Sequence, residues 1–422
     1  MVVGRSTGGV GTHVAELSAN LRQRGEDVTV VTHPLTAERF DFGTVRLWWP
    51  GSAGWVRALR DFVLLRRLVQ TSDIVHAHGH QAALLATVAT LANHSPRERW
   101  RQPRLGTPKR RTPKRRTPKL IVTQHNSVLA GSGRQALKRM AQRWVARRAD
   151  LMTGVSRDLV EEALAFGAGR AELADVPSPR VPGLLAQQLA DGPTRARNRA
   201  TLFSSLVQEQ PDQQVPMGQQ VLLDAQVLPD APVLLDEPVL LDEQARVVPL
   251  IVTISRIAPQ KNLPVLVEAA SRLRNACTWV VLGDGDPLLL DQLLHQVRAL
   301  GAPVRFLGAR SDADRWLRAA EVFVLPSEWE GQPLVVQEAM AAGTPVVATD
   351  VGGLHDMVSG TGLLVIPGDP AAIARAVDRV LDDPELRADL AVRGREVAKA
   401  LPNGRDTAAK WVALYAETLL VT

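Results

Sequence analysis

Short apolar runs alternate with amphipathic helical patterns along most of the chain, most regularly between residues 250 and 381. Runs of three to five apolar residues have the length of a buried strand, and an amphipathic helix between two runs returns the chain to the same edge of a sheet. Alternation of this kind predicts parallel, doubly wound sheets with helices on both faces. The predicted fold class is therefore α/β.

The alternation occurs in both halves of the chain. In the first half the predicted strands are 28–32, 74–76 and 120–123, and the predicted helices are 12–24, 56–69 and 134–148. In the second half the predicted strands are 250–254, 279–282, 304–306, 322–325 and 345–348, and the predicted helices are 263–274, 288–300, 312–319, 335–342 and 371–381. Because 422 residues exceed what one hydrophobic core usually organises, we expect two domains.

We predict an N-terminal domain over 1–185, a low-complexity linker over 186–248 and a C-terminal domain over 249–401. The amphipathic stretch 407–420 follows Pro402-Asn403-Gly404, so we expect 402–422 to form a helix that crosses back to the N-terminal domain. The linker contains the repeat PVLLDE-PVLLDE, whose prolines argue against a helix or a central strand.

The positive charge is concentrated in one segment. Residues 96–119 carry eleven Lys and Arg and one Glu, a net of +10 against +6 for the whole chain, so the remaining residues carry −4. This segment contains the repeat TPKRR-TPKRR-TPK, which has no apolar residue to pack, and we predict a disordered insertion over 96–119. A phosphate-binding arm is the functional alternative to an expanded surface loop. Since the repeat has no aromatic residue and the rest of the chain is mildly acidic, no nucleic-acid partner is expected.

The first strand is short for its expected place. Met1-Val2-Val3 precedes a glycine-rich turn at 6–11, so either the true start lies upstream or the strand is stunted. No apolar run approaches the length of a membrane span, and the single Cys277 cannot form an internal disulfide. We expect a cytoplasmic protein, with a peripheral position on the inner face of the plasma membrane as the alternative.

Four predicted strands of the second half end in turns that carry polar or glycine residues. Arg256 and Lys261 flank the first turn, and the others are Gly283-Asp284-Gly285, Gly308-Ala309-Arg310 and the loop after Leu325. The carboxyl ends of parallel strands form the edge at which open α/β sheets bind ligands, and two cations there suit a diphosphate. Asn262 is placed to cap the helix that begins at Leu263.

The loop after Leu325 reads SEWEGQPLVVQE and leads into a helix. Pro333 suits the first helical turn, whose exposed N–H groups form an anion site. Glu330 lies before that site and Glu338 more than one turn inside the helix, so the two carboxylates could hold two different sugars through vicinal hydroxyls. The plainer interpretation of either carboxylate is compensation of the helix dipole or a solvated face.

The second half resembles the donor domain of family 4 of the retaining glycosyltransferases, which have the GT-B fold. The resemblance rests on SRIAPQKN, LGDGDPL, FLGAR and PSEWEGQPLVVQEAMAAGTPVVATDVGG, which cover most of 251–364. It implies two Rossmann-like, doubly wound domains that face a cleft, and a nucleoside-diphosphate sugar as co-substrate.

The resemblance also implies roles for individual residues. Arg256 and Lys261 would hold the donor diphosphate, Glu330 would contact the transferred sugar and Glu338 the ribose hydroxyls. The implied catalytic set is His125, Glu330, Arg256 and Lys261. The implied donor-binding set is Gly9, Gly11, Arg256, Lys261, Gly283, Arg310, Glu330, Gly331, Gln332, Leu334 and Glu338.

The first half resembles the same family more weakly. Gly8-Gly9-Val10-Gly11 is similar to its glycine loop, His76-Ala77-His78 to its strand-end histidines, and Gln124-His125-Asn126 to the loop whose histidine lies beside the transferred sugar. The role of His78 stays open. Pro177-Ser178-Pro179 departs from the family's usual Asn-Gly-Val-Asp at this turn.

The predicted function is a retaining transfer of a sugar from a UDP- or GDP-linked donor to an unidentified acceptor. Glycolipid, cell-envelope glycan and small-glycoside biosynthesis all fit. We expect no cofactor and no metal, because the cations and the helix N-termini can stabilise the leaving diphosphate. The alternatives are a GT-B sugar-nucleotide epimerase or phosphorylase, and a non-catalytic nucleotide-sugar or nucleic-acid binding protein.

An anionic membrane surface is a further candidate partner. A predicted helix with tryptophans at its start combines basic and apolar side chains, namely Trp48, Trp49, Trp55, Arg57, Arg60, Arg66, Arg67, Leu59, Val63 and Leu64. Such a helix can lie on an anionic surface, although a packing helix with solvated arginines has the same pattern. If the helix lies on a membrane, the chain co-sediments with anionic vesicles and an Arg57/Arg60/Arg66/Arg67→Ser variant does not. Retention of both proteins in the supernatant would contradict the membrane hypothesis.

Overall fold

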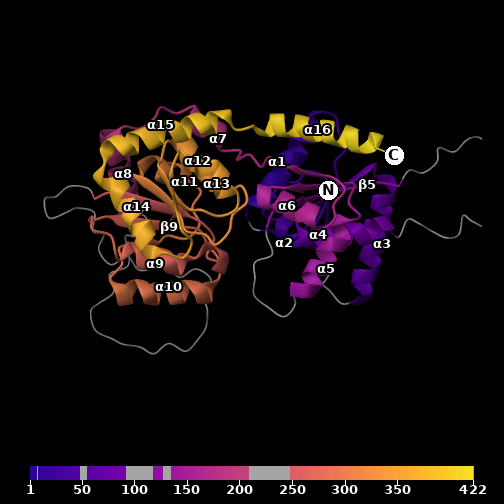
Figure 1. The fold of residues 1–422 in the computed structure, drawn as a ribbon, viewed down its shortest axis with the longest axis horizontal. Coiled ribbons are helices and arrows are strands. Elements are labelled where there is room, and N and C mark those ends of the chain that lie inside the picture. Colours follow the sequence, from indigo (N-terminus) through magenta and orange to yellow (C-terminus); the bar gives the residue numbers. More distant parts are fainter. Residues whose placement is uncertain (7, 48–54, 92–116, 127–134, 209–247, 422) are drawn as a thin grey trace, which may run out of the picture. The chain divides into compact units, whose positions relative to one another are not determined.

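The computed structural model describes residues 1–422 except 7, 48–54, 92–116, 127–134, 209–247 and 422. The described residues form two compact units. Unit 1 comprises Met1–Pro179, Glu330–Leu334 and Pro402–Thr422, and unit 2 comprises Arg180–Trp329 and Val335–Leu401. Each unit has its own parallel sheet covered by helices, so the predicted α/β class is confirmed (Figure 1).

Unit 1 contains a seven-stranded parallel sheet within the described part of the chain, in the order β3-β2-β1-β4-β5-β6-β7. Its strands are β1 Val2–Val3, β2 Val30–Thr32, β3 Val45–Leu47, β4 Ile74–His78, β5 Lys119–Gln124, β6 Leu151–Gly154 and β7 Ala171–Leu173. Its helices are α1 Gly9–Gln23, α2 Pro34–Ala37, α3 Trp55–Thr71, α4 His80–Leu91, α5 Gln135–Ala146, α6 Arg157–Ala165 and α16 Gly404–Leu420. The short β1 is buried between β2 and β4.

Unit 2 contains a six-stranded parallel sheet among its described residues, in the order β10-β9-β8-β11-β12-β13. Its strands are β8 Leu250–Ile254, β9 Thr278–Leu282, β10 Val304–Phe306, β11 Val322–Leu325, β12 Val346–Thr349 and β13 Leu363–Val365. Its helices are α7 Val181–Leu185, α8 Gly192–Gln208, the 3₁₀ turn η2 Pro259–Lys261, α9 Leu263–Ala270, α10 Pro287–Leu300, α11 Ala313–Ala319, α12 Leu334–Ala342, α13 Gly353–Val358, α14 Pro370–Asp382 and α15 Pro384–Ala400.

Successive residues of the central strands of unit 2 pack into two different hydrophobic cores, one on each face of the sheet. Leu250 and Val252 of β8 pack with α8, α11 and α12, whereas Ile251 between them packs with α9, α10 and α14. Side chains along a strand point alternately to its two faces, so a strand buried on both faces is apolar at nearly every position. The uninterrupted apolar runs of the sequence have this physical origin.

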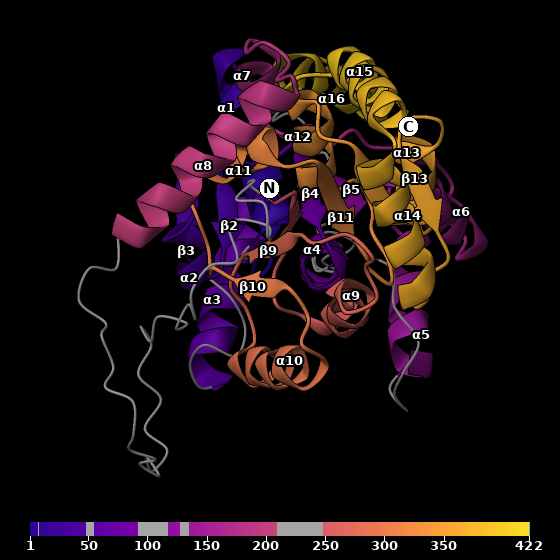
Figure 2. The same cartoon turned by 90° about the vertical axis from the view of Figure 1, so that its left-hand side faces the viewer.

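The predicted linker over 186–248 is wrong at its N-terminal end, and the predicted first domain extends six residues too far. Residues 180–208 belong to unit 2, where α7 and α8 pack against α11 and its neighbours. Figures 1 and 2 show α8 beside α11. Arg195 of α8 donates to the carbonyls of Ala320 and Gly343 at 2.6 and 2.5 Å, and Arg199 pairs with the buried Glu321. A largely polar helical sequence therefore becomes part of unit 2 through its buried arginines together with Leu202 and Phe203.

The PVLLDE repeat and the first two units of the TPKRR repeat lie outside the described residues. The predicted insertion over 96–119 is too long at its end, because Lys119 is the first residue of β5 and binds Asp150 at 2.9 Å. No helix in the described ranges is long and apolar enough to cross a membrane.

The buried ion pair between α8 and β11 yields a stability prediction. We expect Arg199→Met to lower the free energy of unfolding by about 3–5 kcal/mol, because Glu321 would keep a buried charge that has lost its ion pair and retains the hydrogen bond from the Leu250 N–H. The matched control is Arg197→Met on the exposed face of α8, which should change it by less than about 0.5 kcal/mol. Denaturant unfolding followed by circular dichroism measures both, and equal midpoints would contradict the prediction.

Candidate functional site

The predicted strand-end turns of unit 2 lie at one edge of its sheet. Their strands β10, β9, β8 and β11 are neighbours and all parallel. Hydrogen bonds join three of the turns: Ser255 N donates to Leu282 O at 2.9 Å, and Gly283 N donates to Gly308 O at 2.7 Å. The main chain thus continues to pair beyond the ends of the strands.

Gly283 and Gly285 permit the close approach of these turns. A Cβ atom at Gly283 would lie 2.1 Å from the carbonyl oxygen of Ser255, and one at Gly285 would lie 2.1 Å from that of Ile257. Gly283 also has a φ of +139°, which side chains with a Cβ rarely adopt. Gly283, predicted to bind the donor, therefore also has a structural role: it lets the turns that carry Arg256 and Asp284 touch.

Arg256 and Lys261 occupy this edge as predicted from their strand positions. Arg256 is exposed, and Lys261 ends the 3₁₀ turn η2 immediately before α9. The predicted capping by Asn262 is wrong in its mechanism: the residue has a left-handed φ of 50°, and its side chain makes no cap hydrogen bond. The turn redirects the chain so that α9 begins beside two cations.

The loop after β11 is bonded to the turn that carries Lys261. Glu328 N donates to Gln260 O at 2.9 Å, and the Gln260 amide donates to Trp329 O at 2.7 Å. The cationic turn and the beginning of the Glu330 loop are therefore held together within unit 2.

Glu338 has a cationic neighbour that the sequence analysis missed. It is buried on α12, with 5% of its surface exposed, and its Oε2 lies 3.6 Å from Nη1 of Arg180. Arg180 follows directly after Pro177-Ser178-Pro179, where the chain departs from the family pattern. That departure was the available signal.

Arg310 lies at the edge, but Asp312 engages its guanidinium. Nε lies 2.8 Å from one Asp312 oxygen and Nη2 3.3 Å from the other, and the group sits over the ring of Trp316. The pKa of Asp312 is lowered: burial alone would raise it, but the hydrogen bonds and charge of Arg310 outweigh that effect. A phosphate would have to share Arg310 with this carboxylate.

In unit 1 the glycine loop begins α1. Gly9 lies beside Leu334, whose Cδ1 would be 3.8 Å from a Cβ at Gly9, so two of the predicted donor-binding residues are neighbours. Gly11 has a packing role, because a Cβ there would lie 2.3 Å from the Phe40 ring. The amide of Gln332 accepts from Val176 N at 2.8 Å and donates to Ala174 O at 3.1 Å. Gln332 thus binds the main chain that follows β7. The sequence predicted a contact with the donor for this residue and did not predict this contact.

His125 belongs to a cluster of four buried histidines at the carboxyl ends of β4 and β5. His78 Nδ1 lies 3.2 Å from His125 Nε2, and the His76 and His78 rings have centroids 4.1 Å apart. His13 of α1 completes the cluster, with its centroid 5.8 Å from His78 and 5.7 Å from His125. His13, His76 and His78 are no more than 2% exposed, and His125 is 8% exposed.

Burial keeps these rings neutral at pH 7. It lowers the pKa of His13 to about 4 and holds the pKa values of His76, His78 and His125 well below the ordinary value, with further lowering by neighbouring histidines. In a neutral imidazole one nitrogen donates and the other accepts, so the cluster is a set of directional hydrogen-bonding groups.

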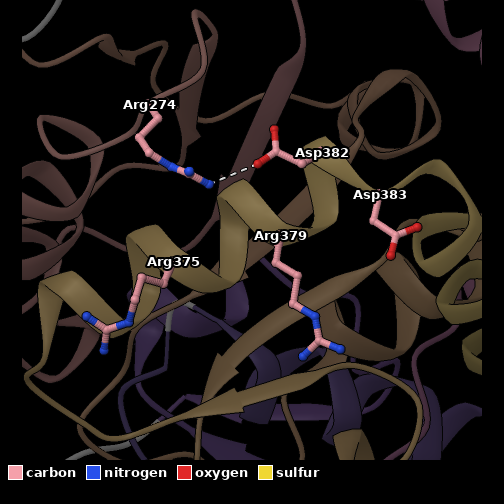
Figure 3. A pocket seen from close by; sticks show the side chains of 5 residues that line it. All are labelled: Arg274, Arg375, Arg379, Asp382 and Asp383. Atoms are coloured by element: carbon pink, nitrogen blue, oxygen red, sulfur yellow. Dashed lines mark hydrogen bonds and ion pairs between the residues drawn. The ribbon is translucent and has the colours of Figure 1, made fainter.

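A separate surface pocket lies on α14 in unit 2 (Figure 3). It is lined by Arg274, Arg375, Arg379, Asp382 and Asp383, none of which is a predicted site residue. Arg274 binds Asp382 at 2.9 Å and Asp378 at 3.3 Å, so its charge is already compensated. Among the described residues no group of three or more His, Cys, Asp or Glu side chains is placed to hold a metal ion.

Two family models match this chain. A model described as "Glycosyl transferase 4-like domain" matches residues 8–179, and one described as "Glycosyl transferases group 1" matches residues 248–383. Curated relatives include the lipopolysaccharide core biosynthesis glycosyltransferase LpsE of Rhizobium meliloti, which is 38% identical over 35% of this chain and 44% of its own length. A D-inositol 3-phosphate glycosyltransferase of Streptomyces avermitilis is 39% identical over 40% of this chain and 39% of its own length. The matches thus span about two fifths of these relatives.

Solved structures show the same fold over nearly the whole chain. HepE of Anabaena in complex with UDP and glucose has a TM-score of 0.72 at 15% identity, covering 99% of both chains. Sucrose-phosphate synthase of Thermosynechococcus elongatus has a TM-score of 0.65 at 19% identity, covering 100% of this chain and 99% of its own. The fold is GT-B, as predicted.

The buried histidines predict a pH-dependent stability of unit 1. The pKa of His13 is about 4 in the folded state and about 6.5 when unfolded, so the unfolded chain takes up the proton first as pH falls. Stability should therefore decrease from about pH 6.5 towards pH 4, by about 1.4 kcal/mol per pH unit for this residue. His13→Leu should reduce that slope. Ser18→Ala in the same helix should leave the slope unchanged, and equal slopes for wild type and His13→Leu would contradict the assignment.

Proposed function

We propose that this chain, whose residues 8–179 and 248–383 match two glycosyl transferase family models, transfers a sugar from a nucleoside-diphosphate sugar to an acceptor with retention of the anomeric configuration. The observation that carries the proposal is the edge of the unit 2 sheet. There the turns bearing Arg256 and Lys261 are hydrogen-bonded to the loop that leads to Glu330. A diphosphate at this edge would meet two cations and the N-terminus of α9.

UDP is the nucleotide we favour. HepE has been crystallised with UDP and with UDP-glucose, and it shares the fold of this chain. GDP remains the alternative donor nucleotide. A thermal-shift series with UDP, GDP and their hexose conjugates separates them, because a ligand at a hundred times its Kd adds about 2.7 kcal/mol to stability.

The ribose and the sugar would bind different carboxylates. Glu338, buried and oriented beside Arg180, is our candidate for the ribose hydroxyls, and Glu330 is our candidate for the transferred sugar. Arg180 would hold the Glu338 carboxylate in one orientation for two neighbouring hydroxyls. His125 would contact the sugar from unit 1.

Departure of the nucleoside diphosphate is the step that needs stabilisation. Negative charge grows on the leaving diphosphate as the glycosidic bond breaks, and Arg256 and Lys261 would stabilise it. The acceptor hydroxyl would attack on the face from which the diphosphate leaves, so configuration is retained. We expect turnover without a divalent metal, since these cations supply the positive charge, and activity that EDTA abolishes would contradict this.

For the acceptor we propose only a chemical class of molecule. The relatives act in lipopolysaccharide core biosynthesis and on D-inositol 3-phosphate, so glycolipids, cell-envelope glycans and small glycosides all fit. We place the reaction in the cytoplasm, with the basic helix α3 as the candidate contact to an anionic membrane.

Steady-state kinetics with varied donor test the assigned roles. Lys261→Ala should lower kcat, because its contact with the diphosphate strengthens in the transition state. Glu338→Gln should mainly raise KM, since the ribose lies far from the breaking bond. A charge-assisted contact contributes about 1.5–3 kcal/mol, so each change should be about tenfold or more. Glu330→Gln should lower kcat more than Glu338→Gln does.

An exposed lysine supplies the matched control for these variants. Lys399 at the end of α15 pairs with Glu396 in its own helix, and Lys399→Ala should leave both kinetic constants unchanged. A fall in kcat for Glu338→Gln together with a rise in KM alone for Lys261→Ala would reverse our placement of diphosphate and ribose.

A further inference from the structure

The C-terminal helix α16 reaches the histidine cluster of unit 1 through two aromatic side chains. Trp411 and Tyr415 lie against His76, with ring centroids 4.4 and 5.8 Å from it. The Tyr415 hydroxyl is 2.8 Å from His76 Nδ1. Residues more than 330 positions apart in the sequence are thus in direct contact.

One direction of the hydrogen bonds around His76 gives an acceptor to each donated proton. The Thr153 hydroxyl donates to Val122 O, which can only accept, at 3.5 Å. The Thr153 hydroxyl can then accept a hydrogen bond from the Thr123 hydroxyl at 2.8 Å. The Thr123 hydroxyl can in turn accept one from His76 Nε2 at 2.7 Å. This leaves His76 Nδ1 to accept from Tyr415, whose pKa burial raises, so that its hydroxyl stays protonated. Each donated proton in this series of hydrogen bonds, from Tyr415 to Val122 O, then has an acceptor.

His76 supports the ring that holds His125. His78 lies against His76 at 4.1 Å, and its Nδ1 bonds Nε2 of His125 at 3.2 Å. Turning the His125 ring away would break this bond inside the protein, where an unpaired polar atom is costly. Nε2 of His125 is therefore committed to His78, which leaves Nδ1 as the nitrogen for a ligand.

We propose that Tyr415, His76 and His78 are positioning residues for His125, and that His125 presents Nδ1 to a hydroxyl of the transferred sugar. The contact with sugar rests on the proposed function, whereas the orientation of His125 rests on the hydrogen bonds alone. Helix α16 thereby fixes the orientation of the His125 ring.

The first test removes single hydroxyls from α16. Tyr415→Phe keeps the ring but removes the donor to His76, and we expect kcat to fall by about tenfold with KM for the donor nearly unchanged. Thr418→Val is the matched control, since its buried hydroxyl donates to Leu414 O of the same helix. We expect that control to keep kcat. Equal kcat values for the two variants would overturn the proposal.

The second test distinguishes the two nitrogens of His125. An asparagine places a polar atom near the position of Nδ1, and a glutamine places one near Nε2. We therefore expect His125→Asn to retain more activity than His125→Gln. By the same reasoning His78→Asn should retain more activity than His78→Leu, because it preserves a polar atom at the Nδ1 position that faces His125. The opposite order in either pair would overturn the assignment.

A readout independent of activity completes the design. Long-range proton–nitrogen NMR of the histidine rings should show His76 protonated at Nε2 in the wild type. Tyr415→Phe should alter the His76 signals, and Thr418→Val should not. If the wild type turns over no nucleotide sugar, the proposed function fails while this measurement still tests the network. Protonation of His76 at Nδ1 would overturn the direction of the hydrogen bonds.

Discussion

The approach of two main-chain turns in unit 2 sets the geometry on which the candidate donor site depends. Ile257 N donates to Asp284 O, and Asp286 N donates to Ile257 O, each at 2.9 Å. These bonds continue the pairing of β8 with β9 past the ends of both strands. They form only because Gly283 and Gly285 have no Cβ to meet the carbonyls of Ser255 and Ile257. The cations Arg256 and Lys261 are thus carried by rigid, paired main chain.

The two units place different chemistry at the carboxyl ends of their strands. Unit 2 presents an exposed arginine, a lysine and a helix N-terminus, all suited to anionic charge. Unit 1 presents buried histidines that burial keeps neutral, together with the beginning of α1. A neutral ring can orient a sugar hydroxyl without attracting phosphate, whereas a cation would compete for it. This contrast supports our proposal that a diphosphate binds at the edge of the unit 2 sheet.

The sequence predicted best those elements that are buried on both faces. Strands β8, β10 and β11 have the predicted bounds, because their residues are apolar except for Thr253 and Arg305. The sequence did not predict helix α8, because its pattern is largely polar. Its buried Arg195 and Arg199 bind Ala320 and Glu321, which lie more than 100 residues further along the chain. The arginine beside Glu338 and the histidine of α1 were missed for the same reason. The family resemblance proposed residue roles, but it did not indicate that Arg310 is already bound to Asp312 or Gln332 to main chain.

Unit 1 is not continuous in sequence, and this explains why prediction along the chain misplaced its limits. The segment Glu330–Leu334 joins it through Gln332, whose amide supplies both a donor and an acceptor to the main chain at 174–176, as a neighbouring strand would. Helix α16 joins it after a capping box at Asn403 and Asp406, and packs Trp411 and Tyr415 against His76. Both segments contribute polar groups that pair with groups inside the unit, which apolar periodicity does not encode. The residues that belong to unit 1 are therefore identified by their hydrogen-bond partners and not by the order of strands and helices along the chain.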